Sequence, residues 1–523
     1  MMLARRTVLA TALGAVASLA CGTEGDAPAR ADVVVVCTDV PPASLNPFVT
    51  PDQVAVDLLP LLYTPLVRRG DDGIEPGAAT SWEWSEDATL VTFRLRDDLS
   101  WHDGEPVTAG DVVWTIRTAA DPEFAYWAGA DFQSLASVEA TDEGTVVVAF
   151  DAPYVAGLEP FSVLPILPEH LLGEQPAASF ARASYHREPV GSGPYMFAGR
   201  AADGSLTFRR ADTGATAPGA GAGPERVLFR FIPETATQLI ELETGGADLC
   251  LMGGSALDDA EDSANLEAMA VGPVGVQVIP LSNDVAPFDD VRVRRAFSAA
   301  LDRRSLASVL SPVARLAGTF MPSGNPFRDP ELLQPDDDPE LAGALLDSAG
   351  WMLREGSAIR RDATGDALEF TVIAPNGAQN IMTAVQSQLR RAGMDARLEF
   401  MEGASFVEAI QDPDNRPAAM ALIFTPERVT TFDPFAELHS EGFANLAGYA
   451  NPEVDALVEA LGRTTDPDER AALYHGLQRE IARDVPTVYT VYIPRALAVG
   501  PGVEGVRVTA AGPFGAIRDW VVR

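Results

Sequence analysis

A strand–helix–strand segment between residues 227 and 252 constrains the fold of this chain more than any other part of its sequence. Val227–Ile232 and Ala247–Met252 are short apolar runs, typical of strands that are covered on both faces. Thr235–Glu243 between them is predicted to be a helix, and Asp32–Cys37 near the N-terminus is a third apolar run. Strands that alternate with helices form parallel sheets, so this segment predicts an α/β fold.

The same alternation returns downstream, which indicates a second domain. Strands predicted at 368–374 and 396–400 flank a helix predicted at 381–389. The chain changes domain near 276–283, and the apolar run at 488–493 would return it to the first domain. One α/β domain is therefore interrupted by another, and two connections between them form a hinge that permits closure around a ligand.

Charge excludes one class of partner. The chain carries 38 lysines and arginines against 75 aspartates and glutamates, a formal net charge of −37. Such a chain repels phosphate backbones, so we expect no nucleic acid as a partner, and no membrane contact through charge. The acidic surface is typical of a soluble protein, and it is also compatible with a preference for cationic ligands.

The sequence contains no recognisable catalytic or metal-binding motif. There is no HExxH, no G-x-S-x-G and no Walker A sequence. The five histidines do not pair at the spacing of metal ligands; they are His102, His170, His186, His439 and His475. We therefore expect no metal, no cofactor and no enzymatic activity.

The N-terminus has the pattern of an export signal. Arg5-Arg6 precede an apolar run that is too short to span a bilayer and that ends in Ser18-Leu19-Ala20-Cys21. We predict a signal at residues 1–21 with a lipid on Cys21, and a tether at 22–31; a plain cleaved signal is the alternative. Export permits a disulfide between Cys37 and Cys250, but two buried free thiols are the simpler expectation.

Residues 79–114 are predicted to form a strand, a turn and a helix. Val91 and Phe93 alternate with polar residues, as in a strand with one buried face, and Asp103-Gly104 is the tightest point of the turn. Thr108 can cap the helix, with Asp111 three residues later. We expect His102, which lies in the turn, to have a structural hydrogen-bonding role.

Several separated motifs together resemble one family. They are Ala79-Thr80-Ser81-Trp82, Trp101-His102-Asp103-Gly104, Gly191-Ser192-Gly193-Pro194-Tyr195, and the run from Pro287 to Ala296 followed by Ala300-Leu301-Asp302-Arg303. In this order they resemble the extracytoplasmic solute-binding proteins of ABC importers, family 5, the peptide and nickel type.

The resemblance implies a two-lobed, periplasmic-binding-protein-like class II fold with an extra subdomain in lobe I. The expected units are lobe I at 32–48, 190–275 and 494–523, the subdomain at 49–189, and lobe II at 276–493. It also implies an extracytoplasmic monomer, anchored to the membrane only through its lipid. Such a protein captures a peptide or similar small polar solute between its lobes and delivers it to an ABC permease.

The resemblance also implies a set of ligand-binding residues. They are Leu45 and Asn46 after the first strand, and Phe424, Thr425, Glu427 and Asp433 in lobe II. Peptide binders of the family hold the peptide amine with an aspartate shortly before an Asp-Pro pair. Here Asp433-Pro434 forms the pair and no aspartate stands at the expected position, so Glu427 or Asp433 would take this role.

Three alternatives remain open at the level of sequence. One is a receptor for a nickel chelate, with His439 near the expected site. Another is an exported hydrolase on the same scaffold, which would consume its substrate rather than bind it with 1:1 stoichiometry. The third is a lipid-anchored sensor or chaperone that signals without import.

Overall fold

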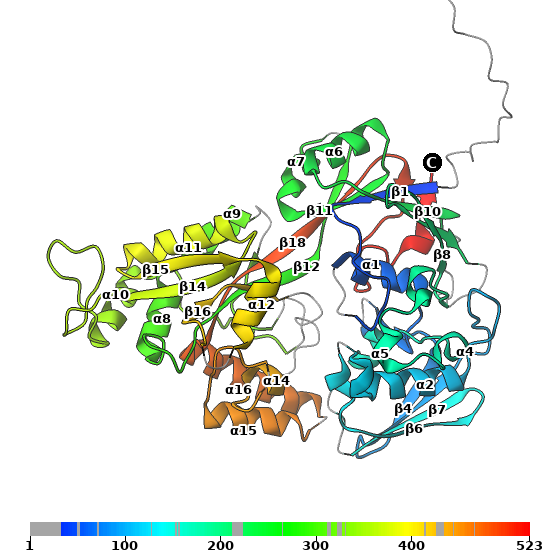
Figure 1. The fold of residues 1–523 in the computed structure, drawn as a ribbon, viewed down its shortest axis with the longest axis horizontal. Helices are drawn as coiled ribbons and strands as arrows, with labels where there is room; N and C mark the ends of the chain where they lie inside the picture. The colour runs from blue at the N-terminus through cyan, green and yellow to red at the C-terminus, as the bar shows by residue number, and fades with distance from the viewer. Residues whose placement is uncertain are drawn as a thin grey trace, which may run out of the picture.

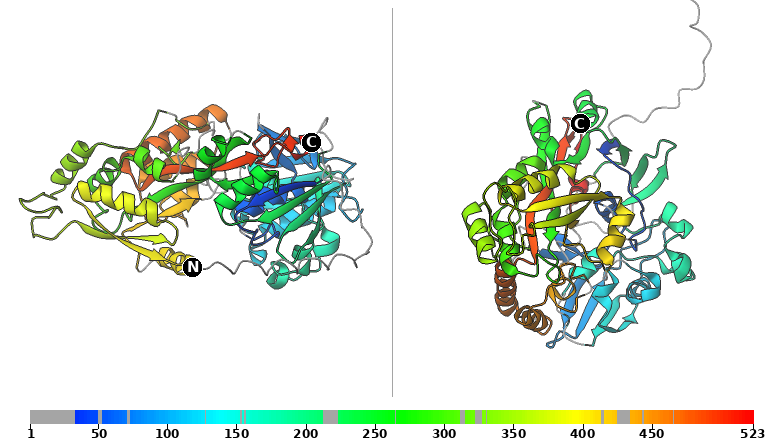
Figure 2. Two further views of the ribbon diagram at one scale, coloured as in Figure 1. Left: turned by 90° about the horizontal axis from the view of Figure 1, so that it is seen from above. Right: turned by 60° about the vertical axis from the view of Figure 1, so that its left-hand side comes forward.

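The computed structural model describes residues 33–49, 53–70, 73–126, 128–151, 154, 157–211, 223–263, 265–310, 315–321, 327–329, 331–412, 415–424, 434–442, 444–464 and 466–523. The predicted signal at 1–21, the tether at 22–31 and the ligand residues Thr425, Glu427 and Asp433 lie outside these ranges. Within them, every helix is too short or too polar to cross a membrane. The chain forms two bodies joined by two long strands (Figures 1 and 2).

The two joining strands are β12 (Glu267–Pro280) and β18 (Thr487–Val499), which pair antiparallel along nearly their whole length. They belong to one sheet that extends into both bodies, in the order β17-β12-β18-β11-β1-β10-β9-β8. The sequence predicted that the run at 488–493 returns the chain to its first domain, and the structure confirms this. The strand is longer than predicted because it continues through Pro494 to pair with β11.

Lobe I contains the predicted parallel α/β unit. Its strands are β1 (Val33–Thr38), β8 (Tyr195–Arg200), β9 (Leu206–Arg210), β10 (Arg226–Phe231) and β11 (Leu249–Gly253). β1 lies between β10 and β11 and is parallel to both, as the strand–helix–strand alternation requires. The helices α6 (Thr235–Thr244) and α7 (Leu257–Glu261) accompany this sheet, and a small ribbon of β19 (Val503–Glu504) and β20 (Val521–Val522) lies near the C-terminus.

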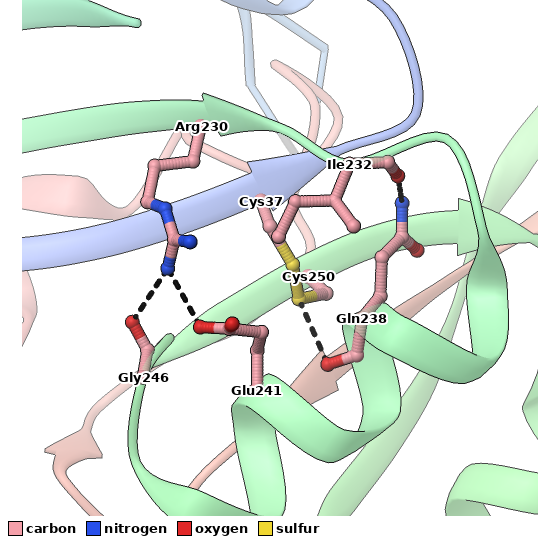
Figure 3. Close-up of a disulfide and its surroundings, with 7 residues drawn as sticks. All are labelled: Cys37, Arg230, Ile232, Gln238, Glu241, Gly246 and Cys250. Carbon is pink, nitrogen blue, oxygen red and sulfur yellow. Dashed lines mark hydrogen bonds and ion pairs between the residues drawn. A yellow bond between two sulfur atoms is a disulfide. The ribbon is translucent and has the colours of Figure 1, made fainter. Parts of the chain in front are cut away.

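Cys37 and Cys250 form a disulfide between β1 and β11 (Figure 3). The expectation of two free thiols is therefore wrong. The parallel register places the two residues directly opposite each other, with their Cα atoms 4.5 Å apart. Helix α6 covers this region, and Arg230 of β10 donates to Glu241 of that helix at 2.7 Å.

The subdomain lies below lobe I in Figure 1. Its antiparallel sheet has the order β4-β5-β7-β6, made of β4 (Ala79–Trp84), β5 (Leu90–Leu95), β6 (Leu135–Asp142) and β7 (Thr145–Phe150). The other elements of this region are α1 (Gln53–Leu62), β2 (Val67–Gly70), β3 (Gly73–Pro76), α2 (Ala109–Ala120), α3 (Glu159–Val163), α4 (Glu169–Leu172) and α5 (Ala177–Phe180). The predicted capping box of α2 is confirmed, since Thr108 and Asp111 each accept the other's backbone N–H.

Lobe II contains a second parallel sheet, in the order β15-β14-β16. Its strands are β14 (Glu369–Pro375), β15 (Asp395–Met401) and β16 (Ala419–Met420), while β13 (Arg315–Leu316) and β17 (Leu422–Phe424) join the large sheet. The helices are α8 (Val291–Ala299), α9 (Arg303–Leu310), α10 (Pro339–Ser348), α11 (Gln379–Arg391), α12 (Gly403–Gln411), α14 (Pro434–Leu438), α15 (Pro452–Leu461) and α16 (Pro467–Asp484). The strand–helix–strand unit predicted between 368 and 400 is β14, α11 and β15.

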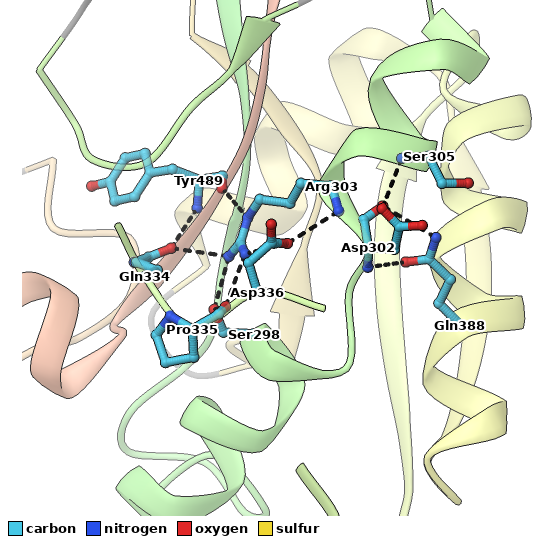
Figure 4. Close-up of polar contacts among 9 residues, drawn as sticks. All are labelled: Ser298, Asp302, Arg303, Ser305, Gln334, Pro335, Asp336, Gln388 and Tyr489. Carbon is cyan, nitrogen blue, oxygen red and sulfur yellow. Dashed lines mark hydrogen bonds and ion pairs between the residues drawn. The ribbon is translucent and has the colours of Figure 1, made fainter. Parts of the chain in front are cut away.

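Arg303 connects the helices of lobe II to the joining strand β18 (Figure 4). Its side chain is buried and donates to the carbonyl of Tyr489 at 2.7 Å and to the carboxylate of Asp336 at 2.9 Å. The preceding Asp302 accepts from the backbone N–H of Ser305 and so caps α9. This Asp-Arg pair is therefore structural.

Candidate functional site

Each lobe contributes a strand that ends where β12 and β18 pass from one lobe to the other. We call this point, residues 271–276 of β12 and 492–497 of β18, the crossing. β11 runs from lobe I toward lobe II, and its last residue, Gly253, pairs with Arg495. β17 runs from lobe II toward lobe I, and its last residue, Phe424, pairs with Val276. Ligands of α/β proteins bind at the carboxyl ends of strands, so this geometry places the candidate site at the crossing.

The crossing is also the boundary between the hydrophobic core of lobe I and that of lobe II. Val271 of β12 belongs to the core of lobe I, whereas Val276 belongs to that of lobe II. On β18 the change falls between Tyr492 and Leu497. The ladder between β12 and β18 shifts register between Val271 and Gly275, so the strands are least regular where packing is divided.

The composition of this point suits a hinge. β12 reads Gly272-Pro273-Val274-Gly275 here, and β18 carries Pro494 opposite this region. Proline cannot donate to a sheet ladder, and glycine adopts many backbone conformations at low cost. The two strands can therefore bend here without breaking a regular ladder.

A buried ion pair lies beside the crossing, on the lobe I side. Arg495, which follows Pro494, donates from Nη1 to Oδ2 of Asp57 at 2.5 Å and from Nη2 to Oδ1 at 2.8 Å. The Asp57 side chain is only 4% exposed. This two-point contact joins helix α1 to the crossing, and sequence reasoning missed it because the two residues are 438 positions apart.

The predicted ligand residues of lobe I are both buried. Asn46 is part of the loop after β1; its Oδ1 accepts from the N–H of Phe48 at 2.9 Å, and its Nδ2 donates to the carbonyl of Ala181 at 3.3 Å. These bonds fold the loop and tie it to the segment after α5. Leu45 is also buried, and it lines a cavity of about 930 Å³ between this loop, β8 and the segment after α5.

The predicted ligand residues of lobe II follow β17. Phe424 ends this strand at the crossing, while Thr425, Glu427 and Asp433 lie outside the described residues. The structure resumes at α14, which begins with Pro434. The structure thus places the start of the predicted lobe II site beside the crossing, and its ligand role stays a prediction.

His439, the residue considered for a nickel-chelate receptor, packs within lobe II. Its ring stacks on Phe435 with centroids 4.3 Å apart, its Nδ1 accepts from the N–H of Glu441, and its Nε2 is 3.9 Å from Glu459. Both ring nitrogens therefore face groups of the same lobe. Among the described residues, no three His, Cys, Asp or Glu side chains gather as a metal site would require.

Gly253 and Gly254 are candidate site residues that sequence reasoning missed. They stand at the carboxyl end of β11 and begin the short helical turn η5 (Gly254–Ala256) at the crossing. Glycine lets a ligand approach the backbone closely. The signal was a Gly-Gly pair directly after a buried strand, but its place at the crossing depends on pairing with β18.

The Trp-His-Asp-Gly turn has the predicted structural role. His102 Nδ1 accepts from the N–H of Gly191, so its Nε2 carries the hydrogen and donates to the carbonyl of Gly193 at 3.0 Å. Both nitrogens are thus used to hold the Gly-Ser-Gly-Pro-Tyr turn. Burial lowers the pKa of His102, in keeping with a neutral ring.

Comparison with known proteins places this fold and its hinge in a family. The model described as "Bacterial extracellular solute-binding proteins, family 5 Middle" matches residues 73–426. The chain belongs to the family 5 solute-binding proteins. Protein XP55 of Streptomyces lividans is 28% identical over 469 residues, 86% of this chain and 83% of that protein.

Two further proteins that are similar to this chain are named for the ligands that they bind. The nickel-binding periplasmic protein of Escherichia coli is 26% identical over 498 residues, 91% of each protein. The solved structure of the oligopeptide-binding protein AppA from Bacillus subtilis, in complex with a nonapeptide, is 22% identical. It aligns with a TM-score of 0.76 over 94% of this chain and 99% of that chain.

Family 5 membership confirms the predicted fold and general role. The chain has the two-lobed periplasmic-binding-protein fold and is the extracytoplasmic substrate-binding component of an ABC-type importer. Family members are binding proteins rather than enzymes, and they work with an ABC permease.

Proposed function

We propose that this protein binds a short peptide, or another small polar solute with a cationic end, between its two lobes. The observation that carries the proposal is the arrival of β11 and β17 at one crossing from opposite lobes. Loops that follow these strands can contact one ligand from both sides. AppA, which has the same fold, was solved with a nonapeptide.

Closure follows from a difference in affinity between two states. A ligand that touches one lobe in the open state and both lobes in the closed state favours closure by the free energy of the added contacts. The glycines and prolines at the crossing allow the rigid lobes to rotate toward each other. The closed, loaded form is the one delivered to the permease.

We assign the ligand contacts to the predicted residues. Glu427 or Asp433 would hold the cationic end of the ligand, and Phe424 and Thr425 would lie beside it. Asn46 and Leu45 support this site by fixing the loop after β1, since both are buried. No covalent chemistry takes place in this scheme, so the ligand leaves the protein unchanged.

The carried ligand can be identified directly. Native mass spectrometry of the purified protein, followed by denaturation, would release a peptide or other small molecule of definable mass. The peptides found would then be titrated by calorimetry beside nickel–histidine. Binding of the nickel chelate in place of peptides would contradict the proposal, as would turnover of a released substrate.

Glu427→Ala tests the site in lobe II. We expect the affinity for a cationic peptide to fall by about 1–3 kcal/mol, because a charged hydrogen bond is lost from a closed site. Glu399→Ala is the control, since Glu399 is an exposed residue on β15 of the same lobe. Unchanged calorimetric affinity of the Glu427 variant, and also of Asp433→Ala, would remove both carboxylates from the site.

We also propose that Cys21 carries a lipid and that the mature protein acts as a monomer on the outer side of the membrane. The support is the Ser18-Leu19-Ala20-Cys21 sequence after an apolar run. Intact mass of the protein from its native membrane would show a lipidated Cys21 as its first residue. A mature chain that starts elsewhere would contradict the anchor.

A further inference from the structure

A cavity on the lobe I side of the molecule is separate from the crossing. Its volume is about 930 Å³, within the range of sites for small organic ligands. It lies between the loop after β1, the Trp-His-Asp-Gly turn, the segment from 181 to 190 and strand β8. All of its lining residues fall between 43 and 200, so lobe II contributes none of its walls.

The walls of this cavity reverse the charge balance of the chain. The protein as a whole has about two acidic residues for each basic one, but the cavity has Arg182, Arg187 and Arg200 against Asp103 and Glu188. Asp103 already pairs with His170, with Nε2 and Oδ2 3.0 Å apart.

The three arginines are free to bind an anion. All three are exposed, and within the described ranges none of them forms an ion pair. Three unpaired guanidinium groups around one cavity favour a ligand with several negative charges, since arginine binds carboxylates through two parallel hydrogen bonds. The protein has a net charge of −37, so a cluster of three unpaired arginines is not expected from its overall composition.

A buried histidine in the same wall lacks one hydrogen-bond partner. His186 is 9% exposed, and its Nε2 is 3.0 Å from the carbonyl of Phe180. A carbonyl only accepts, so Nε2 carries the hydrogen and Nδ1 is an acceptor. Nδ1 has no partner in the structure. That nitrogen is enclosed by protein and has almost no accessible surface, so the ring forms part of the wall and does not bond to a ligand in the cavity.

The remaining wall is apolar. Leu45, Val190 and Phe197 line it together with the polar groups. This suits an organic anion with a carbon skeleton better than a bare inorganic ion. His102, which also lines the cavity, has both nitrogens occupied and acts only as wall.

We propose that this cavity is a second ligand site, specific for a small organic polycarboxylate. Its carboxylates would pair with Arg182, Arg187 and Arg200. The walls of the cavity belong to lobe I and its subdomain, so a ligand can bind there without closure of the two lobes.

Citrate is the first probe, because it has three carboxylates. We expect 1:1 binding by calorimetry to the mature protein, and at least a tenfold loss of affinity in Arg182→Gln/Arg187→Gln/Arg200→Gln. These side chains are exposed, so the variant should fold normally. Arg391→Gln, an exposed arginine on α11 of lobe II, is the matched control and should bind like the wild type.

Tricarballylate, which is citrate without its hydroxyl, is the second probe. We expect it to bind about as tightly as citrate, because the three arginines contact only carboxylates. Absence of citrate binding at millimolar concentration, or equal binding by the wild type and the triple variant, would overturn the proposal.

Discussion

At the scale of single residues, the pair of Asp57 and Arg495 ties helix α1 to the crossing. A buried charge without its partner is expensive, because the protein interior solvates it poorly. Here both oxygens of the carboxylate accept from the guanidinium, which fixes its orientation as well as its charge. Arg495 is thereby held to α1, and it marks the end of the rigid part of lobe I.

Asp57→Asn should lower the free energy of unfolding by about 3–5 kcal/mol, because it leaves Arg495 buried without a counter-charge. Chemical denaturation would measure the loss. Asp98→Asn is the control: it breaks an ion pair with Arg96 in which the aspartate is 64% exposed, and it should cost less than about 1 kcal/mol. Equal stability of the two variants would show that the Asp57 pair contributes no more than a surface pair.

His186 makes stability depend on pH. Burial lowers its pKa from 6.5 to about 4 in the folded protein, so the fold favours the neutral ring. The free energy of unfolding has its full value above pH 6.5, where His186 is neutral in both the folded and the unfolded chain. It falls as pH drops from 6.5 through 4, because the unfolded chain binds the proton more readily than the folded one. We expect His186→Phe to reduce the acid-induced loss of stability by about 1–3 kcal/mol over this range. If the free energy of unfolding falls equally with pH in the wild type and in His186→Phe, this role is contradicted.

At the scale of elements, the junction between α1, the Trp-His-Asp-Gly turn and the Gly-Ser-Gly-Pro-Tyr turn joins the subdomain to lobe I. His102 bonds to Gly191 and Gly193, and the N–H of Gly193 donates to the carbonyl of Leu62 at the end of α1. The glycines are required because a Cβ on Gly191 would lie 1.8 Å from the Leu62 carbonyl oxygen. Two sequence motifs of the family therefore form one joint together with α1.

Gly191→Ala should destabilise the protein by about 3 kcal/mol, because its Cβ would meet backbone atoms that cannot rotate away. Thermal unfolding would show a lower Tm. Gly403→Ala at the start of α12 is the matched control: a Cβ there has nothing within 4 Å, and the substitution should be neutral or slightly stabilising. A normal Tm for Gly191→Ala would mean that α1 and the turn can separate at little cost.

At the scale of the whole molecule, the structure is two packed bodies on one continuous sheet. Among the described residues, the sheet passes from lobe I to lobe II through β12 and β18 alone, and the cores on either side have different members. Bending at the crossing therefore disturbs few packed side chains. This division explains how a rigid receptor can also close.

Saturation with the carried peptide should make the molecule more compact. Small-angle X-ray scattering would show a lower radius of gyration, because the lobes rotate together about the crossing without unfolding. The Glu427→Ala variant, at a ligand concentration that saturates only the wild type, should keep the larger radius. An unchanged radius for the fully loaded wild type would contradict closure.

Local features of this protein were predictable from sequence because they depend on neighbours a few residues away. The capping of α2 by Thr108 and of α10 by Asp338, and the parallel character of β10 and β11, all follow from such patterns. The full length of β18 does not follow from such a pattern, because the predicted apolar run ends at residue 493. The strand continues since β11 and β12 pair with it on both sides there.

The sequence alone determined the fold class, the family and the general role, since motifs and periodicity are local and survive without contacts. Only the tertiary structure decided that Cys37 bonds to Cys250, that Asp57 holds Arg495, and that three arginines surround one cavity. Each of these joins residues that the chain separates widely or that only the folded surface brings together. Strand register and the folding of separate segments onto one another decide these contacts, and no linear pattern records either.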